Sequence, residues 1–236
     1  MQKLGILIAI FLVGCASLKV SPAYVYREMK TPHFTLAVWV KDTNPTAPFE
    51  IYIEGDGHAF TRQGLPASDP TPKGKMMRQL AFTNPAANVA YIARPCQFVT
   101  DPVCTVKDWT TGRFSIEAVQ SMASAIKELA GTREVVLYGY SGGGLLGGLL
   151  IQNYPEIRIK KWITYAGLLN HTSWTKYKKL SPLTDSLDLE QLPAVPQVHY
   201  AGAKDTVIPL ELSKEWTVGQ KLVIIPNATH NGPFGS

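Results

Sequence analysis

The segment Gly139-Tyr140-Ser141-Gly142-Gly143 places a serine in the spacing G-x-S-x-G. An apolar run, Val135 to Tyr138, precedes it and a helical pattern follows, so the serine falls at a strand-to-helix turn. At such a turn the hydroxyl projects above the sheet, and the small flanking residues let the strand and helix pass closely. The pattern therefore predicts a nucleophilic serine. A glycine-rich turn with an uninvolved serine is the alternative.

A serine hydroxyl is a weak nucleophile that needs a base, and the base needs an acid to orient it. Of the five histidines, His230 alone lies beyond the final predicted strand and follows a well-placed acid. His171 falls in a loop, and His199 lies within a strand pattern. His230 is therefore the predicted base.

Three aspartates lie between the serine and His230. Asp205 directly follows a predicted strand, where a carboxylate can orient an imidazole and stabilise its protonated form. Asp185 and Asp188 fall in an irregular stretch with no strand directly before them. Asp205 is the predicted acid, with a turn or helix-capping role as its alternative.

Apolar periodicity predicts strands separated by helices, which indicates a mostly parallel sheet with helices on both faces. The predicted strands are residues 34–40, 49–53, 88–93, 134–138, 161–166, 197–201 and 221–225, and the predicted helices are 75–82, 115–129, 145–154 and 210–216. Residues 15–31 lack a clear pattern and are predicted to be a tether. Nothing divides the remainder, so residues 32–236 are expected to form one domain.

With this elbow, acid and terminal histidine, residues 34–232 resemble the α/β-hydrolase superfamily. The resemblance implies the α/β-hydrolase fold, with Ser141 as nucleophile, Asp205 as acid and His230 as base. It also implies an oxyanion hole formed by the backbone N–H of Gly142 and one N–H from the loop 54–58.

That second donor is expected from Asp56 or Gly57. Glu54 stands where the family commonly has histidine, which leaves the donor open. Tyr-Ile-Glu-Gly-Asp-Gly at 52–57 and Ala-Arg-Pro-Cys-Gln at 93–97 resemble a bacterial lipoprotein-like branch of these hydrolases. Residues 168–192 are expected to be either a minimal cap or a plain surface connection.

The N-terminus has a basic start and an apolar stretch of residues 4–13, about half the roughly 20 residues that a spanning helix needs. Leu12-Val13-Gly14-Cys15 resembles a bacterial lipobox, which implies a signal peptide of residues 1–14 and a lipid-modified Cys15, with palmitate among the expected acyl chains. Ala16 after the cysteine points to the outer membrane, facing the periplasm. An ordinary signal peptide is the alternative.

Two further cysteines, Cys96 and Cys104, bracket a loop with a proline turn signal. In an exported chain the oxidising environment favours a disulfide between them. Two free buried thiols are the alternative. No histidine lies near either cysteine, so the sequence indicates no metal site.

Composition limits the function further. The chain has 236 residues, 45% of them hydrophobic and 17% charged, which excludes a disordered protein. Its net charge of +5 comes from scattered basic residues, and no nucleic-acid-binding module is recognisable.

These features together predict a membrane-anchored serine hydrolase that cleaves a carboxylic ester through an acyl-enzyme, with amides and thioesters as further possibilities. The expected substrate is a small-molecule or lipid-like ester, and no cofactor or metal is indicated. The oligomeric state is open. The alternative from another class is a non-catalytic, ligand-binding lipoprotein on the same fold.

Overall fold

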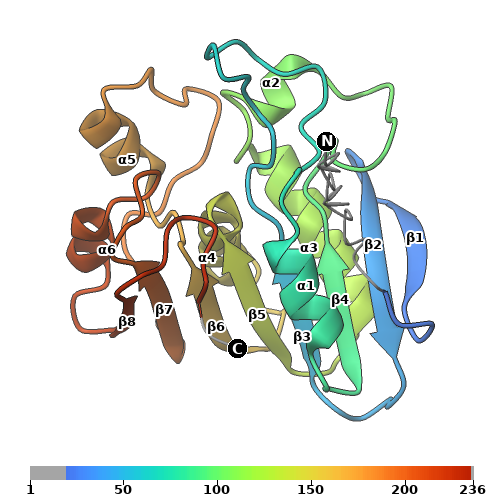
Figure 1. Ribbon diagram of the computed structural model, residues 1–236. Helices are drawn as coiled ribbons and strands as arrows, with labels where there is room; N and C mark the ends of the chain where they lie inside the picture. Colours follow the sequence, from blue (N-terminus) through green and yellow to red (C-terminus); the bar gives the residue numbers. More distant parts are fainter. Residues whose placement is uncertain (1–19, 235–236) are drawn as a thin grey trace, which may run out of the picture.

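A computed structural model describes residues 20–234 (Figure 1), so the predicted signal peptide and Cys15 lie outside the described residues. Eight strands form one sheet in the order β1-β2-β4-β3-β5-β6-β7-β8. β1 pairs with β2, and β2 with β4, in antiparallel fashion, and all pairs from β4 to β8 are parallel. The mostly parallel sheet predicted from the sequence is therefore confirmed.

The strands have five to eight residues, an ordinary length for strands in globular proteins. They are β1 (Val25–Lys30), β2 (Thr35–Asp42), β3 (Phe49–Ile53), β4 (Asn88–Ile92), β5 (Val135–Tyr140), β6 (Ile159–Tyr165), β7 (Gln197–Gly202) and β8 (Lys221–Ile225). The helices between them are α1 (Met76–Thr83), α2 (Val106–Trp109), α3 (Ile116–Ala130), α4 (Gly142–Asn153), α5 (His171–Lys178) and α6 (Leu210–Trp216).

Side-chain alternation divides the core between the two faces of the sheet. On one face Ile51, Leu137 and Trp162 pack against α3 and α4 in the larger apolar cluster. On the other face Tyr52 and Tyr91 pack against α1 in a second cluster. Figure 1 shows α1 in front of the sheet and α3 behind it. Helices therefore cover both faces, as the resemblance implies.

Three elements were not anticipated, and the clearest is β1. Residues 25–30 fall within the predicted tether, but they pair along their whole length with residues 35–40. Only Met29 of this edge strand is buried, so the strand has no apolar alternation for a sequence pattern to detect. The tether prediction does not hold for these six residues.

Helices α2 and α5 are the other two. Helix α2 is a single turn whose start is closed by a capping box between Thr105 and Asp108. Helix α5 lies within the 168–192 segment, so this connection has a short helix and no large cap. In residues 20–234, no helix has the length and apolar character needed to span a bilayer.

Cys96 and Cys104 form a disulfide in the structure, with their sulfur atoms 2.13 Å apart. Cys96 follows β4 and is buried. The bond joins the start and end of the loop between β4 and α2. The alternative of two free thiols does not describe this structure.

The close passage of β5 and α4 gives a test of the fold. A Cβ on Gly139 would lie 2.4 Å from the carbonyl oxygen of Gly143 and 2.6 Å from its carbon, and backbone cannot move aside easily. Gly139→Ala should lower the free energy of unfolding by about 1–3 kcal/mol, measured by chemical denaturation. Gly74→Ala is the matched control, since nothing lies within 4 Å of the added carbon. Equal stabilities for the two variants would contradict this packing.

Candidate active site

Ser141 occupies a strained backbone conformation between β5 and α4. Its φ of 50° and ψ of −123° lie in a region that residues with a side chain rarely adopt. The end of β6 and the loop after it fix Ser141. The N–H of Ser141 donates to the carbonyl of Tyr165 at 3.1 Å, and the carbonyl of Ser141 accepts from the N–H of Leu168 at 2.9 Å. The neighbouring parallel strand thus holds the turn that presents the hydroxyl.

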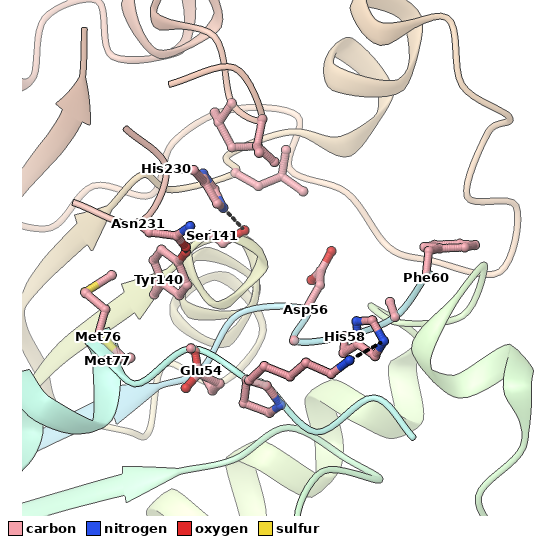
Figure 2. Close-up of a pocket in the computed structure, with 18 of the residues that line it drawn as sticks. Glu54, Asp56, His58, Phe60, Met76, Met77, Tyr140, Ser141, His230 and Asn231 are labelled. Carbon is pink, nitrogen blue, oxygen red and sulfur yellow. Dashed lines mark hydrogen bonds between the residues drawn. The ribbon is translucent and has the colours of Figure 1, made fainter. Parts of the chain in front are cut away.

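A hydrogen-bonded chain connects Ser141, His230 and Asp205. Ser141 Oγ lies 3.1 Å from His230 Nε2, the contact drawn as a dashed line in Figure 2. His230 Nδ1 lies 2.9 Å from Asp205 Oδ2. The three residues follow β5, β7 and β8, whose carboxyl ends meet at one edge of the sheet. The structure therefore brings together the three residues singled out in the sequence.

Asp205 is held so that only one carboxylate oxygen faces the imidazole. Its Oδ1 accepts from the backbone N–H groups of Val207 and Ile208 at 2.8 and 2.9 Å. The side chain is 1% exposed. With Oδ2 accepting from Nδ1–H, His230 Nε2 is left as the acceptor for the Ser141 hydroxyl.

The loop that carries His230 is also anchored. The Tyr140 hydroxyl donates to Asn231 Oδ1 at 2.9 Å, and the Tyr140 ring lies 5.2 Å from the imidazole between ring centres. Figure 2 shows Tyr140, Asn231 and His230 on the same side of Ser141. Tyr140, the residue before Ser141, therefore positions the segment that carries the predicted base.

The other two histidines considered in the sequence analysis, His171 and His199, are buried and contact other residues. His199 is buried between Thr164 and Gln197, at 2.8 and 2.9 Å, and burial lowers its pKa to about 4. His171 is buried with its ring stacked on Phe114. Neither ring reaches Ser141 by a hydrogen bond.

The two alternative aspartates also have other partners. Asp185 pairs with Lys107 at 3.2 Å on the surface. Asp188 accepts from the backbone N–H groups of His171 and Thr172 at the start of α5, at 2.9 and 2.8 Å. Among the aspartates considered, Asp205 is the one in contact with His230.

The predicted oxyanion loop lies beside the first turn of α4. The N–H of Gly142 opens that helix, where a backbone donor has no intrahelical partner. A Cβ on Gly142 would lie 1.9 Å from Asp56 Oδ1, so the Asp56 carboxylate packs against this turn. Only glycine leaves room for this contact.

Two buried arginines hold the Asp56 carboxylate. Arg94 donates to Oδ1, and Arg113 donates to Oδ2 at 2.7 Å. Arg94 also donates to the carbonyl oxygen of Arg113, which joins the two. Burial acts to raise the pKa of Asp56, but the two guanidiniums outweigh it and the pKa is lowered. The carboxylate therefore stays ionised in the folded protein.

The two segments that carry the resemblance contact each other around this loop. Gln97 donates through Nε2 to the carbonyl of Gly55 at 3.0 Å, and its Oε1 accepts from the N–H of Arg94 at 3.1 Å. The Tyr91 hydroxyl donates to Glu54 Oε2 at 2.6 Å, and burial raises the pKa of Glu54. These contacts give residues 93–97 a physical role: they support the predicted oxyanion loop from the end of β4.

Sequence reasoning did not identify Arg94 or Arg113 as site residues. Arg94 lies in segment 93–97, which carries the resemblance, but the sequence alone did not assign it a role. It follows a buried strand, as Asp56 follows the neighbouring strand, and this shared position is the signal that could have identified it. Arg113 lies between α2 and α3, in a stretch with no pattern that points to the site.

A cavity of about 410 Å³ lies over Ser141, between the oxyanion loop, α1 and α5. Its lining includes the polar side chains of His58, Lys73 and Arg113. The apolar part of the lining consists of Phe60, Met76, Met77, Leu168, Trp174, Val207 and Ile208. Because Trp174 belongs to α5, residues 168–192 contribute directly to the cavity. Within residues 20–234, no three His, Cys, Asp or Glu side chains cluster as metal ligands do.

Comparisons with solved structures find the same fold in proteins of low sequence identity. Est1E from Butyrivibrio proteoclasticus is 17% identical with a TM-score of 0.59, covering 89% of this chain and 90% of that one. An a/b serine hydrolase without lid from Xanthomonas campestris is 13% identical with a TM-score of 0.55, covering 91% and 89%. An alpha-beta serine hydrolase homologue from Coxiella burnetii is 14% identical with a TM-score of 0.55, covering 91% of each chain.

These similarities extend over nine-tenths of the chain and show that it has the α/β-hydrolase fold, without a large cap. No protein-family model and no curated protein sequence matches the chain.

The arginine-bound carboxylate gives a test of this site. Asp56→Asn leaves two buried guanidiniums without their counter-charge and should lower the free energy of unfolding by about 3–5 kcal/mol. Because the pKa of Asp56 is lowered by folding, its contribution is present above the unfolded value near 3.8 and is lost as the pH falls through the lower folded value. In denaturation curves, the difference in free energy of unfolding between the two proteins should therefore stay constant from pH 7 to about pH 4 and narrow progressively below that. Asp185→Asn, at an exposed ion pair, is the control and should change stability far less. A difference between wild type and Asp56→Asn that does not narrow below about pH 4 would contradict the description of Asp56 as a buried, ionised carboxylate.

Proposed function

We propose that this protein is a serine hydrolase that cleaves a carboxylic ester through an acyl-enzyme, with thioesters or amides as further substrates. The observation that carries the proposal is the unbroken contact from Ser141 Oγ through His230 to Asp205, at 3.1 and 2.9 Å. Similar structures named as serine hydrolases support the same class of activity.

In the proposed reaction Ser141 Oγ attacks the acyl carbon while His230 Nε2 accepts the hydroxyl proton. Asp205 stabilises the imidazolium that forms. His230 then returns the proton to the leaving group, and the ester bond breaks. Water, deprotonated by the same imidazole, hydrolyses the acyl-enzyme and regenerates Ser141.

The negative charge that develops on the acyl oxygen needs donors fixed in advance. The N–H of Gly142 meets this need, and the loop after β3 offers a second donor from Asp56 or Gly57. The Asp56 carboxylate so close to Gly142 would oppose an oxyanion if its charge were unbalanced, and Arg94 and Arg113 balance it. The arginines thus make an acidic residue compatible with this position.

Mutation of the three residues tests the proposal. Ser141→Ala and His230→Ala should each lower kcat for a 4-nitrophenyl ester by about 10⁴- to 10⁶-fold, and the double variant should lose little more, because the residues act as a unit. Asp205→Asn should cost about 10⁴-fold, since an amide favours the wrong imidazole tautomer.

A fluorophosphonate probe separates the proposal from its alternative. The wild-type protein should be labelled at Ser141, and folded Ser141→Ala should stay unlabelled. His199→Gln is a control for loss of a histidine away from the serine and should keep the label. A folded wild-type protein without label would favour the non-catalytic binding protein instead.

We further propose that the chain is a lipoprotein of the bacterial cell envelope, carrying its lipid on Cys15 after removal of residues 1–14. The support is the lipobox-like sequence Leu12-Val13-Gly14-Cys15 after a short apolar stretch. Several acyl chains on one residue anchor a protein firmly, since each buried methylene contributes about 0.8 kcal/mol. Ala16 supports the outer membrane, with the hydrolase domain facing the periplasm.

The anchor has its own test. Mass spectrometry of the membrane-extracted protein should show an acylated Cys15 at the mature N-terminus. Cys15→Ser should remove the acyl mass and leave the protein either soluble or with residues 1–14 still attached. Ser17→Ala should leave the acylated protein in the membrane fraction. A mature protein that begins elsewhere and carries no acyl mass would refute the anchor.

A further inference from the structure

Of the charged side chains that line the cavity, the acidic ones have strong partners within the protein, whereas one of the basic ones has no acidic partner among residues 20–234. Both acidic residues are occupied: Glu54 accepts from Gly55 N–H and the Tyr91 hydroxyl, and Asp56 is bound by Arg94 and Arg113. Two guanidiniums against one carboxylate leave that cluster with an excess positive charge.

Lys73 lies on the same cavity without an acidic partner. Its Nζ lies 3.1 Å from His58 Nε2, and in the described part of the chain no carboxylate lies within 4 Å of it. An ammonium group has three donors and no acceptor, so His58 Nε2 accepts one N–H and two remain. Lys73 is exposed, and the contact places its ammonium group beside His58 at the cavity.

The position of Lys73 and His58 relative to Ser141 indicates which half of an ester substrate they could contact. In Figure 2 Asp56 lies between Ser141 and His58, and His230 lies on the opposite side of Ser141. His230 must face the leaving group, because it protonates that group. His58 and Lys73 therefore lie away from the leaving group, on a side that the acyl half of the substrate can reach (Figure 2).

We infer that Lys73 and His58 form an anion-binding subsite, and that the preferred substrates are esters whose acyl group carries an anionic end. This inference rests on the proposed hydrolase function and specifies its substrate class. The two free N–H donors of Lys73 bind the anion, and the excess positive charge of the arginine cluster favours it electrostatically. The methylene groups of the acyl chain contact the apolar residues of the cavity lining.

A charge series of esters tests the subsite. The 4-nitrophenyl monoesters of adipic and suberic acid are compared with the hexanoate and octanoate esters and with their ω-trimethylammonio analogues. For the wild-type protein kcat/KM should fall from anionic to neutral to cationic, by roughly tenfold at the first step. The preference should shrink at 0.5 M NaCl, because salt screens the charge.

Variants separate a direct contact from a structural role. Lys73→Gln should remove most of the anionic preference, and Lys73→Glu should reverse the order in favour of the cationic ester. A variant that is merely damaged cannot gain activity on one ester. Lys214→Gln removes an equal charge from α6, away from the cavity, and should keep the wild-type order.

The outcomes distinguish failure of the anion-binding subsite from failure of the proposed hydrolase function. Equal kcat/KM values across the charge series, or a Lys73→Glu variant that keeps the anionic preference, would overturn the subsite and leave the hydrolase intact. A folded wild-type protein that hydrolyses none of the esters and takes no fluorophosphonate label would overturn the hydrolase itself.

Discussion

The ion cluster of Asp56, Arg94 and Arg113 is the interaction on which the geometry of the site depends. It joins the loops after β3 and β4 to the segment before α3, and its carboxylate packs against the first turn of α4. An unpaired buried charge is costly, so each member requires the others. The cluster therefore fixes the loop between β3 and α1 relative to Ser141.

The parallel sheet explains why two separate networks meet at one serine. Asp205 and His230 come from the ends of β7 and β8, on one side of β5, and Asp56 and Arg94 come from the ends of β3 and β4, on the other. Ser141 directly follows β5, between these two groups. In the proposed reaction, the first network activates the Ser141 hydroxyl, and the second lies where negative charge would develop on the substrate.

The cavity combines contributions that are distant in sequence. Trp174 reaches it from α5, where its Nε1 donates to the carbonyl of Val207 at 2.8 Å. The guanidinium of Arg113 lies 5.7 Å from the Phe60 ring and 5.9 Å from the Trp174 ring. These contacts of one cation with two aromatic rings connect the loop after β3 to α5. The short 168–192 segment is thus integrated with the site without covering it.

The sequence by itself predicted strands β2 to β8 and the main helices, and it singled out Ser141, Asp205 and His230, which the structure brings into contact. Each prediction follows from a local signal: apolar periodicity for the elements, the glycine spacing for Ser141, and a position after a strand for Asp205 and His230. Edge strand β1 was missed because only one of its residues is buried. The tertiary structure alone decided that Arg94 and Arg113 bind Asp56, that Lys73 meets His58, and that Asp185 and Asp188 have other partners. These pairings join residues from separate loops, and only the order of strands in the sheet determines which loops become neighbours.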